Sequence, residues 1–156
     1  MQRHARLANA FSPQRHTHDR FGHRIDEVEF HPSYHALMAE AMAQGLHATL
    51  WSLGPGAHID HAAAFMLFTE AQPSVLCPIS MSYAVTPALR ANAAIYRAVG
   101  PGLASTRYDQ RFIPASQKHG LAMGMGMTEK QGGSDVRANT TQAEPDGQDD
   151  RARATA

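Results

Sequence analysis

The stretch GMGMTEKQGGSD, Gly124 to Asp135, is the most unusual passage in this sequence. From Leu121 to Met127, large apolar residues recur at every second position, which is the period of a β-strand. Residues two apart in a strand share a face. The pattern therefore predicts a strand over residues 121–127, with a methionine face that can fill a core and a glycine face that carries no side chains.

Polar and flexible residues follow the predicted strand. Thr128 supplies a hydroxyl at its end, and Gly132 and Gly133 permit the positive φ angles of a tight turn. Ser134 adds a second hydroxyl, and Asp135 can bond the backbone of its own turn. Amides and hydroxyls that converge beside a bare strand suit a flavin ring and a diphosphate. On spacing alone, an ordinary glycine-rich hairpin turn explains the stretch as well.

Two common phosphate-binding motifs fail on spacing. The dinucleotide fingerprint GxGxxG requires glycine at position 129, where the chain has Glu129. A P-loop that begins at Gly126 requires glycine and then lysine at the positions held by Gln131 and Gly132.

The residues before this stretch predict helices. Apolar residues at three-to-four spacing favour a helix over residues 31–52, and a second apolar pattern favours a well-buried helix over 57–72. A third helix is expected over 86–99, with Thr86 as N-cap, and a short one before Pro114. Pro73 and Pro78 are expected to interrupt the chain between the second and third helices.

The composition excludes several classes of protein. The 156 residues include fourteen basic and fourteen acidic side chains, so the net charge gives no general attraction to nucleic acid or to an anionic membrane. No run of 18 apolar residues predicts a membrane span. Cys77 is the single cysteine, which excludes an internal disulfide and fits a reducing cytoplasm.

Other candidate sites have weaker support. The pairs His31/His35 and His58/His61 have helical spacing for half a zinc site, but no glutamate completes an HExxH pattern and no cysteine pair is present. Structural or surface roles are expected for these histidines, and no metal site is assigned. Cys77 lies in an apolar stretch and is expected to be buried and inert.

The segment MTEKQGGSD resembles the flavin-binding signature of the acyl-CoA dehydrogenases, which runs Thr-Glu, a short spacer and Gly-Ser-Asp. The longer GMGMTEKQGGSDV is similar to the alkylation-response branch of that family, the AidB-like proteins. The same branch is similar over RLAN, DEVEFHPSYHALM, LCPISMSYAVTP and RYDQRFIP. The resemblance covers roughly residues 5–145.

The resemblance implies a fold and an activity. Complete members have an N-terminal helical domain, a middle β-barrel and a C-terminal helical bundle, and they bind FAD between these domains. They remove the α-proton of an acyl-CoA with a glutamate base and pass the β-hydride to the flavin. AidB-like members are linked to the response to DNA alkylation and carry a DNA-binding region near the C-terminus. The fold class expected here is therefore mainly α, an N-terminal helical domain plus the first strand of the barrel.

The resemblance also assigns site residues. The expected flavin contacts are Met125, Gly126, Met127, Thr128, Glu129, Lys130, Gln131, Gly132, Gly133 and Ser134. Thr128 and Ser134 are expected to contact the acyl-CoA substrate as well. Glu129 is not expected to be the catalytic base, which lies in the C-terminal bundle of the family, so no catalytic residue is assigned.

Four parts are expected along the chain. Residues 1–32 form a polar loop or short hairpin around Gly22, 33–115 a partial helical domain, 116–143 the start of a β domain with the flavin-binding loop, and 144–156 a disordered tail. A lone strand is not a stable ending, so we expect the chain to be a truncated member of the family.

We expect this truncated protein to be inactive alone and not to retain FAD. The alternative is a helical interaction module that associates with a full-length relative or another protein. Exposed apolar faces would then drive oligomerisation.

Overall fold

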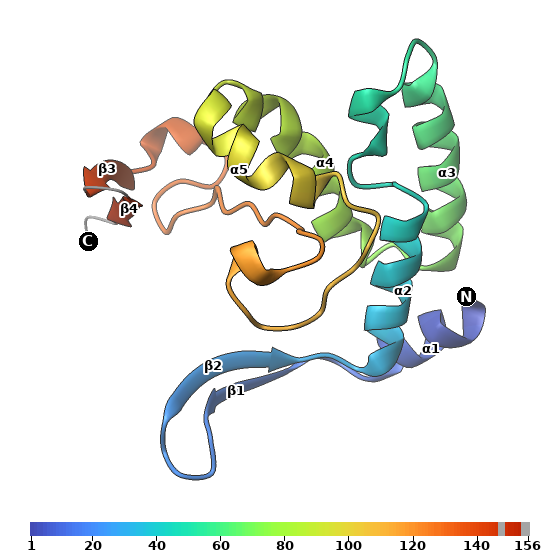
Figure 1. The fold of residues 1–156 in the computed structure, drawn as a ribbon. Helices are drawn as coiled ribbons and strands as arrows, with labels where there is room; N and C mark the ends of the chain where they lie inside the picture. Colours follow the sequence, from blue (N-terminus) through green and yellow to red (C-terminus); the bar gives the residue numbers. More distant parts are fainter. Residues whose placement is uncertain (147–148, 154–156) are drawn as a thin grey trace. The chain divides into compact units, whose positions relative to one another are not determined.

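The computed structural model describes residues 1–146 and 149–153. The chain divides into two compact units, Met1–Gly124 and Met125–Ala156, which are described separately. The first contains α1 (Gln2–Ala10), β1 (Gln14–His18), β2 (Arg24–Glu29), α2 (Pro32–Ala43), η1 (Thr49–Ser52), α3 (Ala57–Ala71), α4 (Leu76–Arg90), α5 (Ala93–Leu103) and η2 (Ala115–Gln117) (Figure 1). The second contains η3 (Val136–Ala138), β3 (Gln142–Asp146) and β4 (Asp149–Arg153). The mainly helical fold class is confirmed.

Helix α2 begins and ends with recognisable caps. The His31 side chain accepts a hydrogen bond from the Ser33 amide at 3.1 Å, and Pro32 takes the first helical position. At the other end Gly45 has a φ of 71°, and the Leu46 amide donates to the Ala41 carbonyl at 3.1 Å. This left-handed glycine cap ends the helix. The single helix expected over 31–52 is therefore α2 followed by the separate turn η1.

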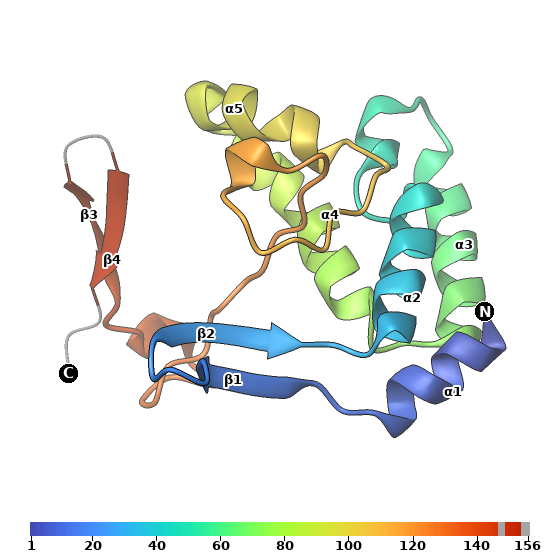
Figure 2. The same cartoon turned by 60° about the horizontal axis from the view of Figure 1, so that its bottom comes forward.

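The core of the first unit lies around α2, which runs between α3 and α4 in both views (Figures 1 and 2). Each buried side chain of this cluster is at most 5 % exposed. The members are Leu37, Met38, Ala41, Met42 and Leu46 from α2 and the turn after it, Phe68 from α3, and Val75, Leu76 and Ile79 from α4 and its start.

Helix α3 confirms the helix predicted over 57–72, but its predicted burial is wrong. Only Ala57 and Phe68 are buried on it. Ile59, Met66 and Leu67 are 74 %, 70 % and 75 % exposed. A helix that is apolar on all sides can bury only the side that finds a partner, and α2 covers one side of α3 within the described residues.

Helix α4 overturns the predicted break at the prolines. It runs through Pro78, which lies in the first turn where no amide donor is needed. It also contains Pro87 in its interior. The Tyr83 carbonyl, left without a donor at position 87, accepts the Trp51 indole N–H at 2.9 Å. A residue far away in sequence therefore satisfies the carbonyl that the proline leaves open.

The third helix therefore begins later than predicted. Asn92, and not Thr86, is its N-cap, because the Asn92 side chain accepts the amides of Ala94 and Ile95 at 3.1 and 3.2 Å. Thr86 is buried inside α4. The short helix expected before Pro114 is also wrong, since the turn η2 follows that residue.

The hairpin expected around Gly22 is confirmed as β1 and β2, which pair antiparallel from Gln14 opposite Glu29. The Asp19 carboxylate accepts the Phe21 and His23 amides at 2.8 and 2.9 Å and closes the tip. Helix α1 was not predicted, because it lies in a segment rich in Arg and His in which Leu7 is the one large apolar residue of the helix. It is held by its neighbours, with Gln72 Nε2 donating to Asn9 Oδ1 at 2.7 Å.

The second unit differs from the sequence expectation. β3 and β4 pair antiparallel from Gln142 opposite Arg153 to Asp146 opposite Asp149. The disordered tail expected over 144–156 is therefore wrong for these strands, because their backbones pair with one another. Residues 147–148 and 154–156 lie outside the described part of the chain. None of the described helices is long and apolar enough to cross a membrane.

Candidate functional site

The strand expected over 121–127 does not form in the described chain. The Leu121 amide donates to the Gly102 carbonyl at 2.9 Å, and the Met123 amide donates to Ser82 Oγ at 2.8 Å. Ser82 is fully buried on α4. Helices therefore satisfy the backbone donors that a neighbouring strand would have taken. Gly102 permits this approach, since a Cβ there would lie 2.8 Å from the Leu121 side chain.

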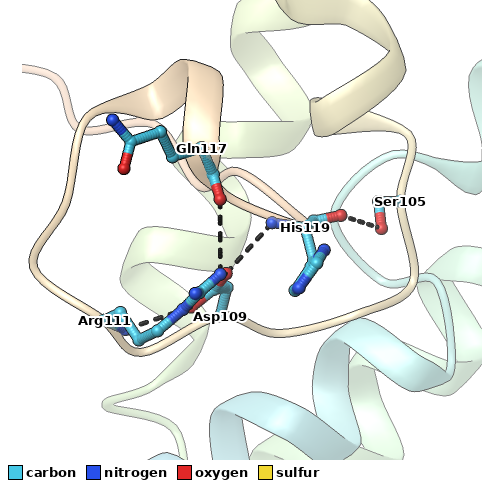
Figure 3. A network of polar contacts seen from close by, with 5 residues as sticks. All are labelled: Ser105, Asp109, Arg111, Gln117 and His119. Carbon is cyan, nitrogen blue, oxygen red and sulfur yellow. Dashed lines mark hydrogen bonds and ion pairs between the residues drawn. The ribbon is translucent and has the colours of Figure 1, made fainter.

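A network centred on Asp109 closes the loop over residues 105–120 (Figure 3). The Asp109 carboxylate accepts Arg111 Nε at 2.8 Å, Arg111 Nη2 at 2.5 Å and the His119 amide at 3.0 Å. Arg111 also donates to the Gln117 carbonyl at 3.3 Å, and Ser105 Oγ donates to the His119 carbonyl at 2.8 Å. The Ser105–His119 contact joins the two ends of the loop, and the contacts of Asp109 with His119 and of Arg111 with Gln117 join its first half to its second.

The Asp109 network should make the stability of the first unit depend on pH. The Arg111 guanidinium, and next the His119 amide, hold the pKa of Asp109 well below its usual range. The Asp109 side chain is only 5 % exposed. Because the folded pKa is lowered, the stabilisation is fully present above about pH 4 and is lost as the pH falls further.

Asp109→Asn should therefore lower the free energy of unfolding at pH 7 and reduce its further fall at pH 3. The amide keeps one acceptor oxygen but loses the charge that strengthens both Arg111 contacts. Urea denaturation followed by circular dichroism at both pH values measures this change. Glu27→Gln, at an exposed position on β2, is the control. Equal behaviour of the two variants would show that the network does not stabilise the loop.

His47, which follows α2, forms a hydrogen bond to the same loop. This contact was not predicted from the sequence. His47 is completely buried, and its Nε2 donates to the Ser105 carbonyl at 2.9 Å. Burial lowers its pKa, which favours the neutral imidazole. A lone histidine after an apolar run gave no signal for this contact, because its partner is 58 residues away in sequence.

The glycines of the predicted flavin segment, Met125–Ser134, are largely uncovered. A Cβ on Gly126 or Gly133 would meet no described heavy atom within 4 Å. The Thr128 and Ser134 side chains are exposed. The uncovered glycine surface expected from the sequence is thus present at these two positions.

The methionines of this segment do not fill a core. Met125 and Met127 are 62 % and 51 % exposed, so the predicted packing of the methionine face is wrong in the described chain. Without strand pairing, no second layer covers that face.

A turn and two side chains organise the segment. Glu129 and Gly132 exchange backbone hydrogen bonds of 3.0 and 3.2 Å. Gly132 is buried, and Asn139 Oδ1 occupies the place that a Cβ would need. Asn139 Nδ2 also donates to the Met127 carbonyl at 2.5 Å. The remaining residues of the segment are exposed, apart from the half-buried Glu129.

Another protein group contacts each of the four histidines considered as zinc ligands: His31, His35, His58 and His61. His31 caps α2, and His35 Nδ1 lies 2.8 Å from the Tyr108 hydroxyl. His58 Nδ1 lies 2.8 Å from the Tyr83 hydroxyl, and His61 Nε2 donates to the Leu46 carbonyl at 2.9 Å. The described residues contain no group of three or more side chains that could hold a metal ion.

Cys77 corrects another expectation, because it is exposed and not buried. The prediction rested on its apolar neighbours in sequence. Helix α4 turns Leu76 and Ile79 into the core and leaves Cys77 on the outer side.

A cavity of about 810 Å³ opens in the first unit beside α2. This cavity could not be predicted from the sequence, because it is built from segments that are distant along the chain. Its walls combine Phe30, Tyr34 and Met38 with Tyr108 and Asp109. Burial, together with the nearby Tyr34 and Asp109, raises the pKa of Tyr108 to about 12, so its hydroxyl remains protonated.

Comparison with known families supports the resemblance. The family model described as "Adaptive response protein AidB N-terminal domain" matches residues 1–110. The chain belongs to this family. The AidB N-terminal domain therefore corresponds to the helices and the β1–β2 hairpin of the first unit, and the match ends within the 105–120 loop.

Individual relatives agree with the family match. The Escherichia coli (strain K12) protein named "Putative acyl-CoA dehydrogenase AidB" is 44 % identical over 142 residues, which cover 89 % of this chain and 26 % of that protein. The chain thus spans about a quarter of the length of this AidB relative.

Solved structures share the fold. The structure titled "Bd2924 apo-form" matches with a TM-score of 0.78 and 27 % identity, over 92 % of this chain and 28 % of that chain. ACDH-11 of Caenorhabditis elegans, in complex with C11-CoA, matches with a TM-score of 0.80 and 23 % identity, over 98 % of this chain and 26 % of that chain. The second likeness shows the fold alone.

Proposed function

We propose that Met125–Ser134 is the flavin-contacting segment of an FAD-dependent acyl-CoA dehydrogenase-like protein of the alkylation-response branch. One observation carries the proposal: Gly126 and Gly133 are uncovered, and the hydroxyls of Thr128 and Ser134 are exposed beside them. The 44 % identity to a protein named as an acyl-CoA dehydrogenase supports the assignment of the reaction class.

The residues of the segment fit a flavin. Gly126 lets a flat ring approach the backbone without meeting a side chain. Thr128 and Ser134 can donate hydrogen bonds to the ring, to a diphosphate or to the thioester of an acyl-CoA. The exposed ammonium of Lys130 can attract the diphosphate. When bound, FAD supplies an acceptor for the hydride that an acyl-CoA loses.

No residue of this chain is assigned as the base that removes the substrate proton. A positioned base contributes roughly 10²–10⁴-fold in rate, and one exposed segment encloses little of a ligand as large as FAD. We therefore propose that the chain alone turns over no acyl-CoA.

Since the chain belongs to the AidB family, we also propose a role in the response to DNA alkylation and a cytoplasmic location. DNA contact is assigned to no residue of this chain, because its fourteen basic and fourteen acidic side chains balance.

A helical interaction module is the second candidate function, and the outer side of α3 favours it. Met66 and Leu67 lie seven and eight residues after Ile59, about two helical turns further along the outer side, and each of the three is at least 70 % exposed. Exposed apolar surface of this kind marks contact sites. Sedimentation of the purified chain separates the two candidates, since concentration-dependent association without any flavin binding supports the module.

Equilibrium dialysis against FAD tests the proposed function. We expect the purified chain to be colourless and to bind added FAD weakly, with a Kd on the order of 1 mM. Riboflavin, which has the ring without the diphosphate, should compete for the same site. Absence of FAD binding at a concentration of several times this Kd would contradict the proposal.

A further inference from the structure

The Glu129 carboxylate is directed back into its own loop. Oε2 accepts the Thr140 amide at 2.8 Å, and Oε1 accepts the Thr141 amide at 3.0 Å. Gln131 Nε2 donates to Oε2 at 2.5 Å. Both oxygens are therefore engaged by groups of the same chain, two of them backbone amides eleven and twelve residues further on.

These contacts close residues 129–141 into one loop. The reciprocal backbone bonds between Glu129 and Gly132 form its tight end. Glu129 and Asn139 lie partly buried within it, whereas Thr128, Gly133 and Ser134 are exposed. Glu129 and Asn139 thus take the inner positions of the loop, and Thr128 and Ser134 lie at its exposed surface.

The charge of Glu129 strengthens the closure. Hydrogen bonds from amides to a carboxylate are stronger than those to a neutral oxygen. The Thr141 hydroxyl and the amides of Thr140 and Thr141 lower the pKa of Glu129 to about 2. The carboxylate is therefore ionised at neutral pH, and the closed loop needs no partner outside it to keep the charge.

We propose that Glu129 is a positioning residue of the flavin segment: its carboxylate closes the loop and so presents Thr128 and Ser134 outward, without contacting the flavin. This role rests on the proposed function for the flavin itself, whereas the closure of the loop is independent of it. Glu129 is thus a supporting residue of the loop and not one of the flavin contacts expected from the sequence.

Amide hydrogen exchange in the full chain tests the closure. In Glu129→Ala, exchange at Thr140 and Thr141 should become roughly tenfold faster or more, since both amides lose their acceptor. Glu129→Gln keeps one carbonyl oxygen and should protect one of the two amides. Val136→Ala, at an exposed position within the same loop, is the matched control and should leave both unchanged. Unchanged exchange in Glu129→Ala would overturn the proposal.

The same variants separate positioning from general stability. In Glu129→Ala the thermal unfolding of the helical unit should stay as in the wild type, while FAD binding in dialysis weakens and Glu129→Gln restores part of it. Faster exchange with undiminished FAD binding would also overturn the positioning role. Because the exchange measurement needs no flavin, a wild-type chain that binds no FAD would contradict the proposed function alone.

Discussion

Replacing Gly120 by alanine should lower the free energy of unfolding of the helical unit by about 3 kcal/mol. Gly120 is buried, and a Cβ there would overlap the Arg107 carbonyl oxygen and lie 3.3 Å from Ser105 Oγ. The clash is with backbone, which cannot rotate away as a side chain can. The two ends of the 105–120 loop would have to separate, and the Ser105 contact with His119 would be lost. Urea denaturation followed at 222 nm measures the change.

Gly54→Ala is the control for this substitution. Gly54 has no described heavy atom within 4 Å of an added Cβ, and its φ is not positive. The control should change stability by less than about 0.5 kcal/mol. Equal stability of the two variants would show that Gly120 and Arg107 are not in close contact.

Gly126→Val should weaken FAD binding more than roughly tenfold, which is about 1.4 kcal/mol. A Cβ at this position would have no described heavy atom within 4 Å, so the chain should fold as the wild type does. Its isopropyl group would instead occupy the place proposed for the flavin ring. Equilibrium dialysis of both proteins against FAD measures the difference.

The control for this effect is Gly54→Val, which adds the same side chain at another open position. It should leave FAD binding unchanged. Wild-type affinity in Gly126→Val would mean that the ring does not approach the backbone there.

The sequence predicted the helical class because apolar patterns over residues 31–52 and 57–72 indicated the regions of α2 and α3. It failed where a distant partner decides the local structure. Pro73 and Pro78 indicated an interruption and Thr86 the start of a helix, yet α4 runs from Leu76 to Arg90, and Trp51 donates to the carbonyl that Pro87 leaves open. The alternation over 121–127 indicated a strand, yet Gly102 and Ser82 satisfy its donors.

The candidate site could be predicted only where it does not depend on distant partners. Glycine lacks a side chain wherever it lies, so the bare surface at Gly126 could be read from the sequence. The role of Glu129 could not, because its partners Thr140 and Thr141 are reached only when the loop closes. The burial of Asn139 against Gly132 likewise depends on that closure.

The most direct test of the flavin assignment is a ¹H–¹⁵N correlation spectrum of the chain recorded during titration with FAD. The account predicts that amide shifts change with increasing FAD at Gly126, Thr128, Gly133 and Ser134. Changes confined to the cavity around Tyr34 and Met38, or no changes at millimolar FAD, would contradict it.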